Sequence, residues 1–231
     1  MENISDPHPS RWAGLRTRII WGAALAVPVL AALWLGGWLF ILMAVAAGLV
    51  MLREWDGLTA AAPAAWKWLG LLYVGAPCAS LIWLRQARFA NMEPVGGKLV
   101  LFILLVVWAT DIGAYFAGKK LGGPKLAPML SPGKTWAGLG GGIVAAAVVG
   151  AAASAFTPYP ASFIACMDVG VLMAIVAQAG DLFESWLKRR AGVKDSGALI
   201  PGHGGLLDRV DGLVFTLPFF AWLVYLSGDM L

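Results

Sequence analysis

Four polar residues recur at helical spacing near the end of a mostly apolar chain. Asp181, Glu184, Ser185 and Lys188 stand at positions i, i+3, i+4 and i+7, so a helix would place all of them on one face. Apolar residues precede this group and two arginines follow it, so the face lies where a helix leaves an apolar phase. A carboxylate there is costly unless it is paired or binds a cation. The pattern predicts either a cation and phosphate site or a simple ion pair with Lys188.

A second polar group follows about twenty residues later. Gly204 and Gly205 come after His203, and glycine lets backbone N–H groups approach a phosphate without a Cβ clash. Asp208 and Asp211 are hard oxygen ligands of the kind that Mg²⁺ prefers. The alternative is that Asp208 caps a helix and Asp211 lies in its first turn. His203 taken alone fits a structural hydrogen-bonding residue better than a catalyst.

Two further candidates lie earlier in the chain. Ser131, Lys134 and Thr135 fall in a loop that resembles the end of a nucleotide-binding P-loop, but Pro128 occupies the position where that motif needs glycine. These three side chains could still contact phosphate oxygens, although a basic loop that only sets membrane topology explains them as well. Asp111 interrupts an apolar run, and such a residue usually faces a bundle interior or a polar cavity.

The composition identifies the elements that must position these residues. Of 231 residues 60% are hydrophobic and 13% are charged, about half the roughly 25% of a soluble domain. We therefore predict an all-α, polytopic integral membrane helix bundle. Although the net charge is +4, the cations lie in loops between apolar runs, which indicates membrane orientation and not nucleic-acid binding. The runs predict about seven transmembrane helices, near residues 19–35, 38–54, 67–84, 98–118, 138–156, 164–187 and 212–228.

The positive charges predict the orientation of this bundle. With the N-terminus inside, all 17 Lys and Arg residues except Arg85, Arg88 and Lys98 fall on one side, which the positive-inside rule assigns to the cytoplasm. No linker divides the chain, so we expect a single membrane domain over residues 1–231. Within it, 1–97 supply packing helices and 98–231 supply the catalytic helices and cytoplasmic loops.

The segment from Ser185 to Gly212 resembles the signature of the phosphatidate cytidylyltransferases, also called CDP-diacylglycerol synthases. The matching residues are Ser185, Lys188, Arg189, Lys194, Asp195, Gly197, Pro201, His203, Gly204, Gly205, Asp208, Arg209 and Asp211. Upstream, residues 180–185 (GDLFES), 111–115 (DIGAY) and 131–135 (SPGKT) resemble further motifs of the family. The sequence departs from the family pattern at Ala137, where glutamate is usual, and at Ile112, where threonine is frequent.

The resemblance implies an enzyme that transfers CMP from CTP to phosphatidic acid and releases pyrophosphate. It implies a Mg²⁺ centre, of one ion or two, at Asp181 and Asp208, with Glu184 and Asp211 completing or orienting the ligand shell. The catalytic set would be Asp181, Asp208, Lys188 and Arg209. The phosphate contacts would be Ser185, Arg189, Lys194, Asp195, His203, Gly204, Gly205, Asp111, Ser131, Lys134 and Thr135. It also implies membrane lipids as partners, a homodimer, and a site facing the cytoplasm at a bacterial inner membrane.

Two alternatives remain on the sequence alone. The same chemistry could act on another lipid phosphate or on a polyprenol acceptor, because nothing in the sequence names the lipid. A cation or phosphate transporter could also bury Asp111, Asp181 and Lys188 in a bundle. A transporter predicts internal repeats with broken helices in both halves, whereas here the polar residues lie almost wholly in the second half.

Overall fold

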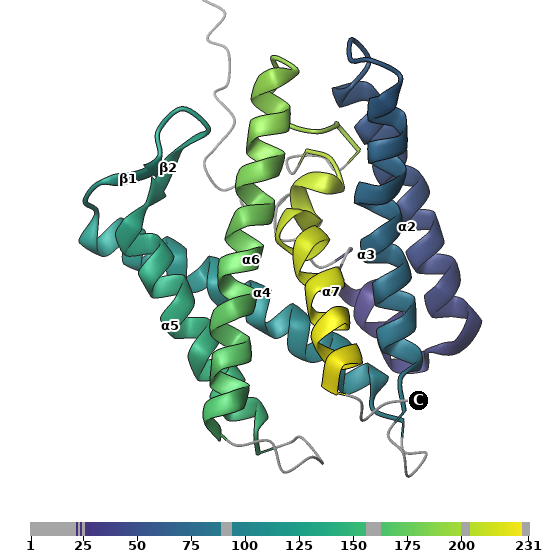
Figure 1. Ribbon diagram of the computed structural model, residues 1–231, viewed down its shortest axis with the longest axis vertical. Helices are drawn as coiled ribbons and strands as arrows, with labels where there is room; N and C mark the ends of the chain where they lie inside the picture. The colour runs from purple at the N-terminus through teal and green to yellow at the C-terminus, as the bar shows by residue number, and fades with distance from the viewer. Residues whose placement is uncertain are drawn as a thin grey trace, which may run out of the picture.

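The computed structural model is a bundle of long helices, as the composition predicted (Figure 1). It describes residues 22, 24, 26–88, 94–155, 163–199 and 204–227. Within these ranges six helices are long and apolar enough to cross a membrane. The elements are α2 Gly37–Leu58, α3 Ala65–Gln86, α4 Gly96–Leu121, β1 Lys125–Ala127, β2 Ser131–Thr135, α5 Trp136–Ala153, α6 Phe163–Arg190 and α7 Leu207–Ser227.

The first predicted span differs from the other six. Its described part forms a shorter apolar helix, Ala26–Leu35, which ends where Gly36 adopts a positive φ of 66°. A side chain at Gly36 would also collide with the Arg85 guanidinium, because a Cβ there would lie 2.2 Å from Nη2. Arg85 reaches this turn from the end of α3 and donates from Nε to the Leu33 carbonyl at 3.0 Å. Gly36 and Gly37, both with positive φ, therefore make a sharp turn between the two helices, and Arg85 contacts it from α3.

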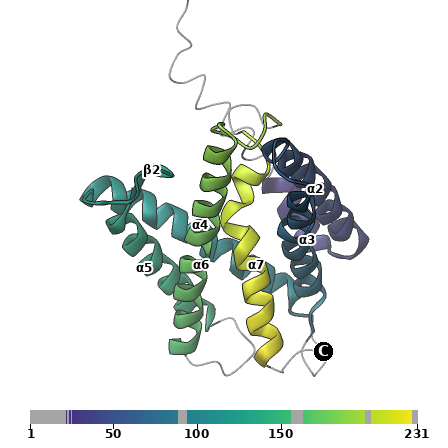
Figure 2. The same ribbon diagram turned by 45° about the horizontal axis from the view of Figure 1, so that its top comes forward.

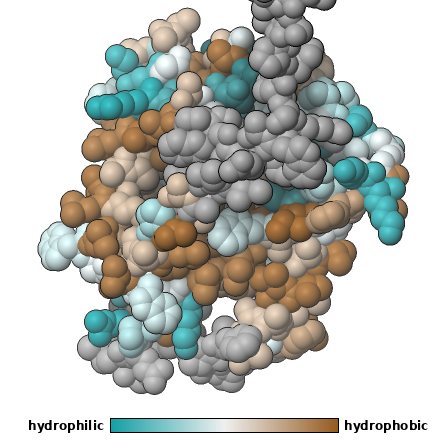
Figure 3. Space-filling model, turned by 180° about the vertical axis from the view of Figure 1, so that it is seen from behind, coloured by the Kyte–Doolittle hydropathy of each residue, from teal (hydrophilic) through white to brown (hydrophobic). Residues whose placement is uncertain are grey.

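The polar connections gather at one end of the bundle. The α2–α3 loop, the β1–β2 hairpin and the segment that follows α6 all lie at the top of Figure 1, and they come forward together in Figure 2. α4 crosses obliquely behind α6 and α7 in both views. A hydrophobic band covers the middle of the back face, with hydrophilic residues above and below it (Figure 3). This distribution matches a membrane-spanning bundle with polar residues at both ends.

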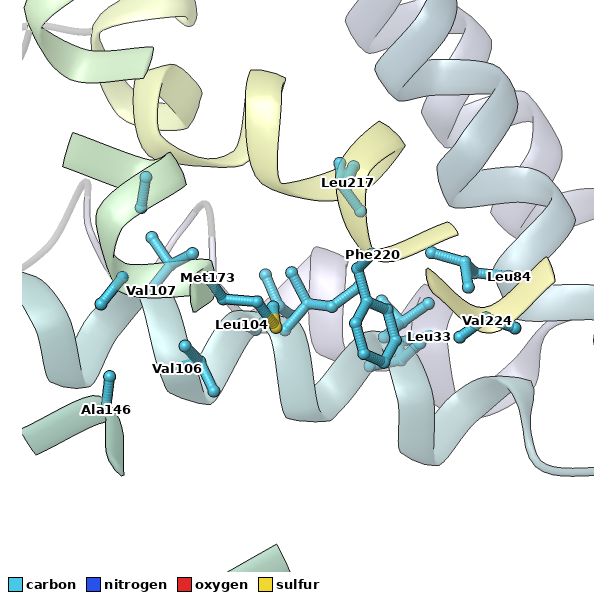
Figure 4. Close-up of a cluster of buried hydrophobic side chains, with 14 of the residues drawn as sticks. Leu33, Leu84, Leu104, Val106, Val107, Ala146, Met173, Leu217, Phe220 and Val224 are labelled. Carbon is cyan, nitrogen blue, oxygen red and sulfur yellow. The ribbon is translucent and has the colours of Figure 1, made fainter. Parts of the chain in front are cut away.

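The main core forms where α4 crosses the other helices. Leu104 and Val107 of α4 pack beside Met173 of α6 and Leu217 and Phe220 of α7 (Figure 4). Phe102 of α4 also packs against Phe220, with ring centroids 5.7 Å apart. These contacts fix the oblique helix to the two helices that carry most of the candidate site residues.

Small residues let α4, α5 and α6 approach closely. A Cβ on Gly113 of α4 would lie 2.5 Å from the Gly141 carbonyl oxygen of α5, and one on Gly170 of α6 would lie 2.4 Å from the Ala146 carbonyl oxygen. Membrane helices associate through such close packing because lipid is as apolar as their side chains. The Gly- and Ala-rich span is therefore used for contacts inside the chain. The expected homodimer stays a prediction.

The middle loop is more regular than the sequence indicated. Lys125–Ala127 and Ser131–Thr135 pair as an antiparallel hairpin, so the bundle is nearly, not wholly, helical. Thr135 ends the second strand and caps α5, because its Oγ1 accepts a hydrogen bond from the Gly138 amide at 3.0 Å. The hairpin thereby holds Lys134 at a fixed position directly before α5.

Candidate active site

The last turns of α6 carry the polar face that the helical spacing predicted. Lys188 Nζ lies 3.2 Å from Glu184 Oε1 and 2.6 Å from Asp208 Oδ1 on α7. One turn earlier, Ser185 Oγ donates to Asp181 Oδ1 at 3.4 Å. The Lys188 and Glu184 side chains are 15% and 0% exposed, so this ion pair is shielded from solvent. The face is therefore shared by α6 and the start of α7.

Asp208 lies in the first turn of α7, one residue after the helix begins, so the predicted helix cap at this position was wrong; the residue instead faces a lysine and holds the preceding loop. Its Oδ2 accepts hydrogen bonds from the Gly205 amide at 2.8 Å and from the Ser196 amide at 2.8 Å and hydroxyl at 3.0 Å. Gly204 has a φ of 80°, and a Cβ there would lie 2.6 Å from Asp208 Oδ2. Glycine is required at this position because both the backbone angle and the space exclude a side chain.

Glu54 is a site residue that the sequence analysis did not identify. It lies on α2, yet its Oε1 accepts from the Leu206 amide at 2.7 Å and its Oε2 from the Leu207 amide at 2.8 Å. Ser196 Oγ also donates to Glu54 Oε2, at 3.1 Å. A carboxylate at a helix N-terminus satisfies the free amides and complements the helix dipole. Glu54 therefore fixes the start of α7, and with it Asp208, from a helix about 150 residues earlier.

A second lysine–carboxylate pair lies nearly two turns earlier on the same helix. Lys134 of the hairpin forms an ion pair with Asp181, and the two side chains are 19% and 24% exposed. Both residues line a cavity of about 440 Å³ between α4, β2, α5 and α6, and Asp111 lines it from α4. Asp211 of α7 interacts electrostatically with both Asp111 and Asp181. The structure thus brings Asp111, Lys134, Asp181 and Asp211 together from four separate elements.

The other predicted phosphate contacts lie around these two pairs. Arg189, Lys194, Asp195 and Arg209 are exposed at the polar end of the bundle. Arg189 donates to the Leu130 carbonyl of the hairpin turn at 3.4 Å, which ties α6 to the hairpin. Thr135 is buried as a cap, and Ser131 pairs with Ala127 in the hairpin. His203 lies outside the described residues.

The carboxylates show one feature that fits a bound cation. Glu184 is fully buried, and within the described ranges Lys188 Nζ, 3.2 Å from Oε1, is the one group that lies beside its oxygens as a partner. A buried carboxylate with a single partner is costly, and a further cation would compensate it. Among the same residues, however, no three Asp, Glu, His or Cys side chains gather tightly enough to hold a metal. Lys134 and Lys188 supply the positive charge beside Asp181 and Asp208.

Comparison with known sequences decides the family. The profile described as the cytidylyltransferase family matches residues 64–227, more than half of the chain. This chain belongs to the cytidylyltransferase family. Proteins named phosphatidate cytidylyltransferase from Brucella suis biovar 1 (strain 1330) and Rickettsia bellii (strain RML369-C) are 41% and 39% identical to it. The matches cover 94% of this chain in both cases, and 94% and 92% of the relatives.

A relative of the same name from Bacillus subtilis (strain 168) is 43% identical over 59% of this chain and 51% of its own length. The residues of this cytidylyltransferase that match the family profile include both lysine–carboxylate pairs and all of α3–α7. Glu54 lies before the matched segment. The matched segment therefore includes α6 and α7, while the Glu54 contact from α2 lies outside it.

Proposed function

We propose that this protein is a phosphatidate cytidylyltransferase, which transfers CMP from CTP to phosphatidic acid and so makes CDP-diacylglycerol. Its family and the shared name of its full-length relatives support this reaction. The observation that carries the proposal is the pairing of two lysines with two aspartates at the polar end of a membrane bundle. Transfer of a nucleotidyl group to a lipid requires such charges beside an apolar phase.

The reaction needs positioning and charge more than a dedicated base. A lipid phosphate oxygen bonds to the α-phosphorus of CTP, while the bond from this phosphorus to the bridging oxygen breaks and pyrophosphate leaves. A phosphate monoester has its second pKa near about 6, so the attacking group is already largely ionised near neutral pH. In this proposal Lys188 and Lys134 neutralise phosphate oxygens, and the exposed Arg189, Lys194 and Arg209 attract the triphosphate; the support is the ion pairs of the two lysines with Asp208 and Asp181 and the exposure of the other three side chains.

We include Mg²⁺ in this proposal because of the donor set. Asp181 and Asp208 would hold the ion, and Glu184 and Asp211 would complete or orient its surroundings. The support is the fully buried carboxylate of Glu184, which has Lys188 as its single partner among the described residues, and the preference of Mg²⁺ for carboxylate oxygens. When bound, the ion would supply charge stabilisation for the transferring phosphates and the pyrophosphate.

The proposed location is a bacterial inner membrane with the active site facing the cytoplasm. The six membrane-length helices support the membrane, and the positive residues at the polar end support the cytoplasmic side. CTP is made in the cytoplasm, so this orientation also gives the enzyme access to its nucleotide. A homodimer is part of the same proposal and rests on the family resemblance alone.

The proposal is tested by CTP turnover of the purified protein in detergent with phosphatidic acid and Mg²⁺. We expect labelled CTP to enter the lipid phase, and we expect EDTA or Asp208→Asn to remove this activity. Asp56→Asn is the matched control, because Asp56 is an exposed acid on α2 at the polar end of the bundle. A folded wild-type protein that forms no CDP-lipid with phosphatidic acid would refute the substrate assignment.

A further inference from the structure

The cavity beside Asp181 contains a lysine that the proposed reaction has not yet used. Lys119 lines it from the last turns of α4, together with Lys134 from the hairpin. Its Nζ donates to the Tyr115 hydroxyl at 3.3 Å and lies 5.5 Å from the centre of that ring. Among the described residues no carboxylate pairs with Lys119. It is exposed, and its charge is therefore available to an anion.

The cavity meets the membrane-facing surface at this lysine. Tyr115 lines the cavity and is also 59% exposed, and its neighbours on α4, Ile112 and Phe116, are 58% and 64% exposed. On α5, which forms another wall, Trp136 and Val144 are 58% and 64% exposed. A ligand with an anionic head and apolar chains could thus place its head in the cavity while its chains remain along α4 and α5. A free nucleotide has no apolar part to match this surface.

The Lys188–Asp208 pair has different surroundings. It lies next to the polar segment after α6, where Lys194 and Asp195 are exposed, and beside the exposed Arg209 of α7. Asp181 and Lys188 are seven residues apart on α6, which at about 1.5 Å per residue puts their backbone positions roughly 10 Å apart, although Lys188 Nζ reaches back to within 3.2 Å of Glu184 Oε1. The site therefore offers two neighbouring places for phosphate, of which one borders the lipid and the other borders water.

We propose that the cavity between α4, β2, α5 and α6 binds the phosphomonoester head of the lipid substrate, and that Lys119 at its membrane-facing mouth contacts this phosphate. The proposal rests on the proposed function for the identity of the lipid, and it leaves the triphosphate beside Lys188. At about 440 Å³ the cavity falls within the roughly 300–1,000 Å³ that small-ligand sites occupy. A phosphate monoester carries about −1.5 to −2 charges at neutral pH, which two lysines can match.

The test compares Lys119→Gln with Lys120→Gln in steady-state kinetics. Lys120 is the matched control because it is the next residue of α4, is exposed and does not line the cavity. We expect Lys119→Gln to raise the KM for phosphatidic acid about ten-fold and to leave the KM for CTP unchanged, because it removes one charge-assisted hydrogen bond. Lys120→Gln should change both constants less than about two-fold. Equal effects of the two variants, or a rise in the KM for CTP alone, would overturn the assignment.

A binding experiment separates this inference from the proposed reaction. Calorimetry without CTP measures how tightly the detergent-solubilised protein binds dihexanoyl phosphatidic acid, with dihexanoyl phosphatidylcholine as the phosphodiester comparison. We expect binding of the phosphomonoester only, and about ten-fold weaker binding by Lys119→Gln. If the protein binds the phosphomonoester through Lys119 but the wild type makes no CDP-lipid, the proposed reaction is wrong and the proposed lipid-phosphate site is supported. If the wild type is active but the lysine has no effect on binding, the site is wrong and the reaction stands.

Discussion

The contact between Glu54 and the start of α7 makes a strong prediction for Glu54→Gln. The carboxylate accepts three hydrogen bonds, from the amides of Leu206 and Leu207 and from the hydroxyl of Ser196. A glutamine offers one oxygen, and its NH₂ group would face a donor, so at least one of the two amides loses its partner. The Ser196 hydroxyl can rotate towards Asp208, which it already contacts at 3.0 Å.

The size of this effect follows from the burial of the amides. Leu207 is fully buried, and a buried donor left without an acceptor costs about 1–3 kcal/mol. The hydrogen bond at the second amide is also weakened. Together we expect Glu54→Gln to destabilise the arrangement that holds Asp208 in its active position by about 2–3 kcal/mol. Since about 1.4 kcal/mol corresponds to a factor of ten, kcat should fall about 30- to 140-fold.

The assay is CDP-lipid formation at saturating CTP and phosphatidic acid, measured beside thermal stability. Asp56→Asn removes an acid from the same helix but from an exposed position, and it should stay within about two-fold of the wild type. In the double variant with Ser196→Ala the two losses should not add, because both residues act on one network. A folded Glu54→Gln protein with a kcat within about three-fold of the wild type would refute the positioning role.

Two further substitutions test the packing and the charge balance of the site. Lys188→Met leaves the fully buried Glu184 without its ion partner, so we expect a loss of about 3–5 kcal/mol in the free energy of unfolding. This is measured by denaturation in detergent. Lys194→Met is the control, and because Lys194 is exposed, this variant should leave the free energy of unfolding unchanged. Gly141→Val should lower the melting temperature by several degrees, because a Cβ there lies 2.2 Å from another side chain, while Gly140→Val meets nothing within 4 Å. A similar response of both glycine variants would contradict the close helix contact.

The sequence predicted the parts of the site that depend on local spacing. The helical period placed Asp181, Glu184 and Lys188 on one face, whereas the predicted cap at Asp208 was wrong, because α7 begins one residue earlier, at Leu207. The shared face arises from residues within two turns of each other, so periodicity is sufficient to predict it. Six of the predicted spans also became helices, since a bilayer demands long apolar runs.

The contacts between distant segments were not predictable in this way. Glu54 meets amides more than 150 positions away, and its only local signal is an acid at the end of an apolar run. The pairing of Lys134 with Asp181 depends on a hairpin whose strands are three and five residues long, too short for an alternating pattern to reveal. Lys119 looked like one more positive charge in a loop, and only the packing of α4 against α5 places it at a cavity.

The central claim is that the enzyme transfers a nucleotidyl group to a lipid phosphate, and the position of the label in CTP tests it most directly. Purified protein is given phosphatidic acid and CTP labelled either at the α- or at the γ-phosphorus. We predict that the α-label enters the lipid and that the γ-label leaves as pyrophosphate. Recovery of the γ-label in the lipid would indicate a kinase, and an intact CTP pool with folded protein would contradict the account.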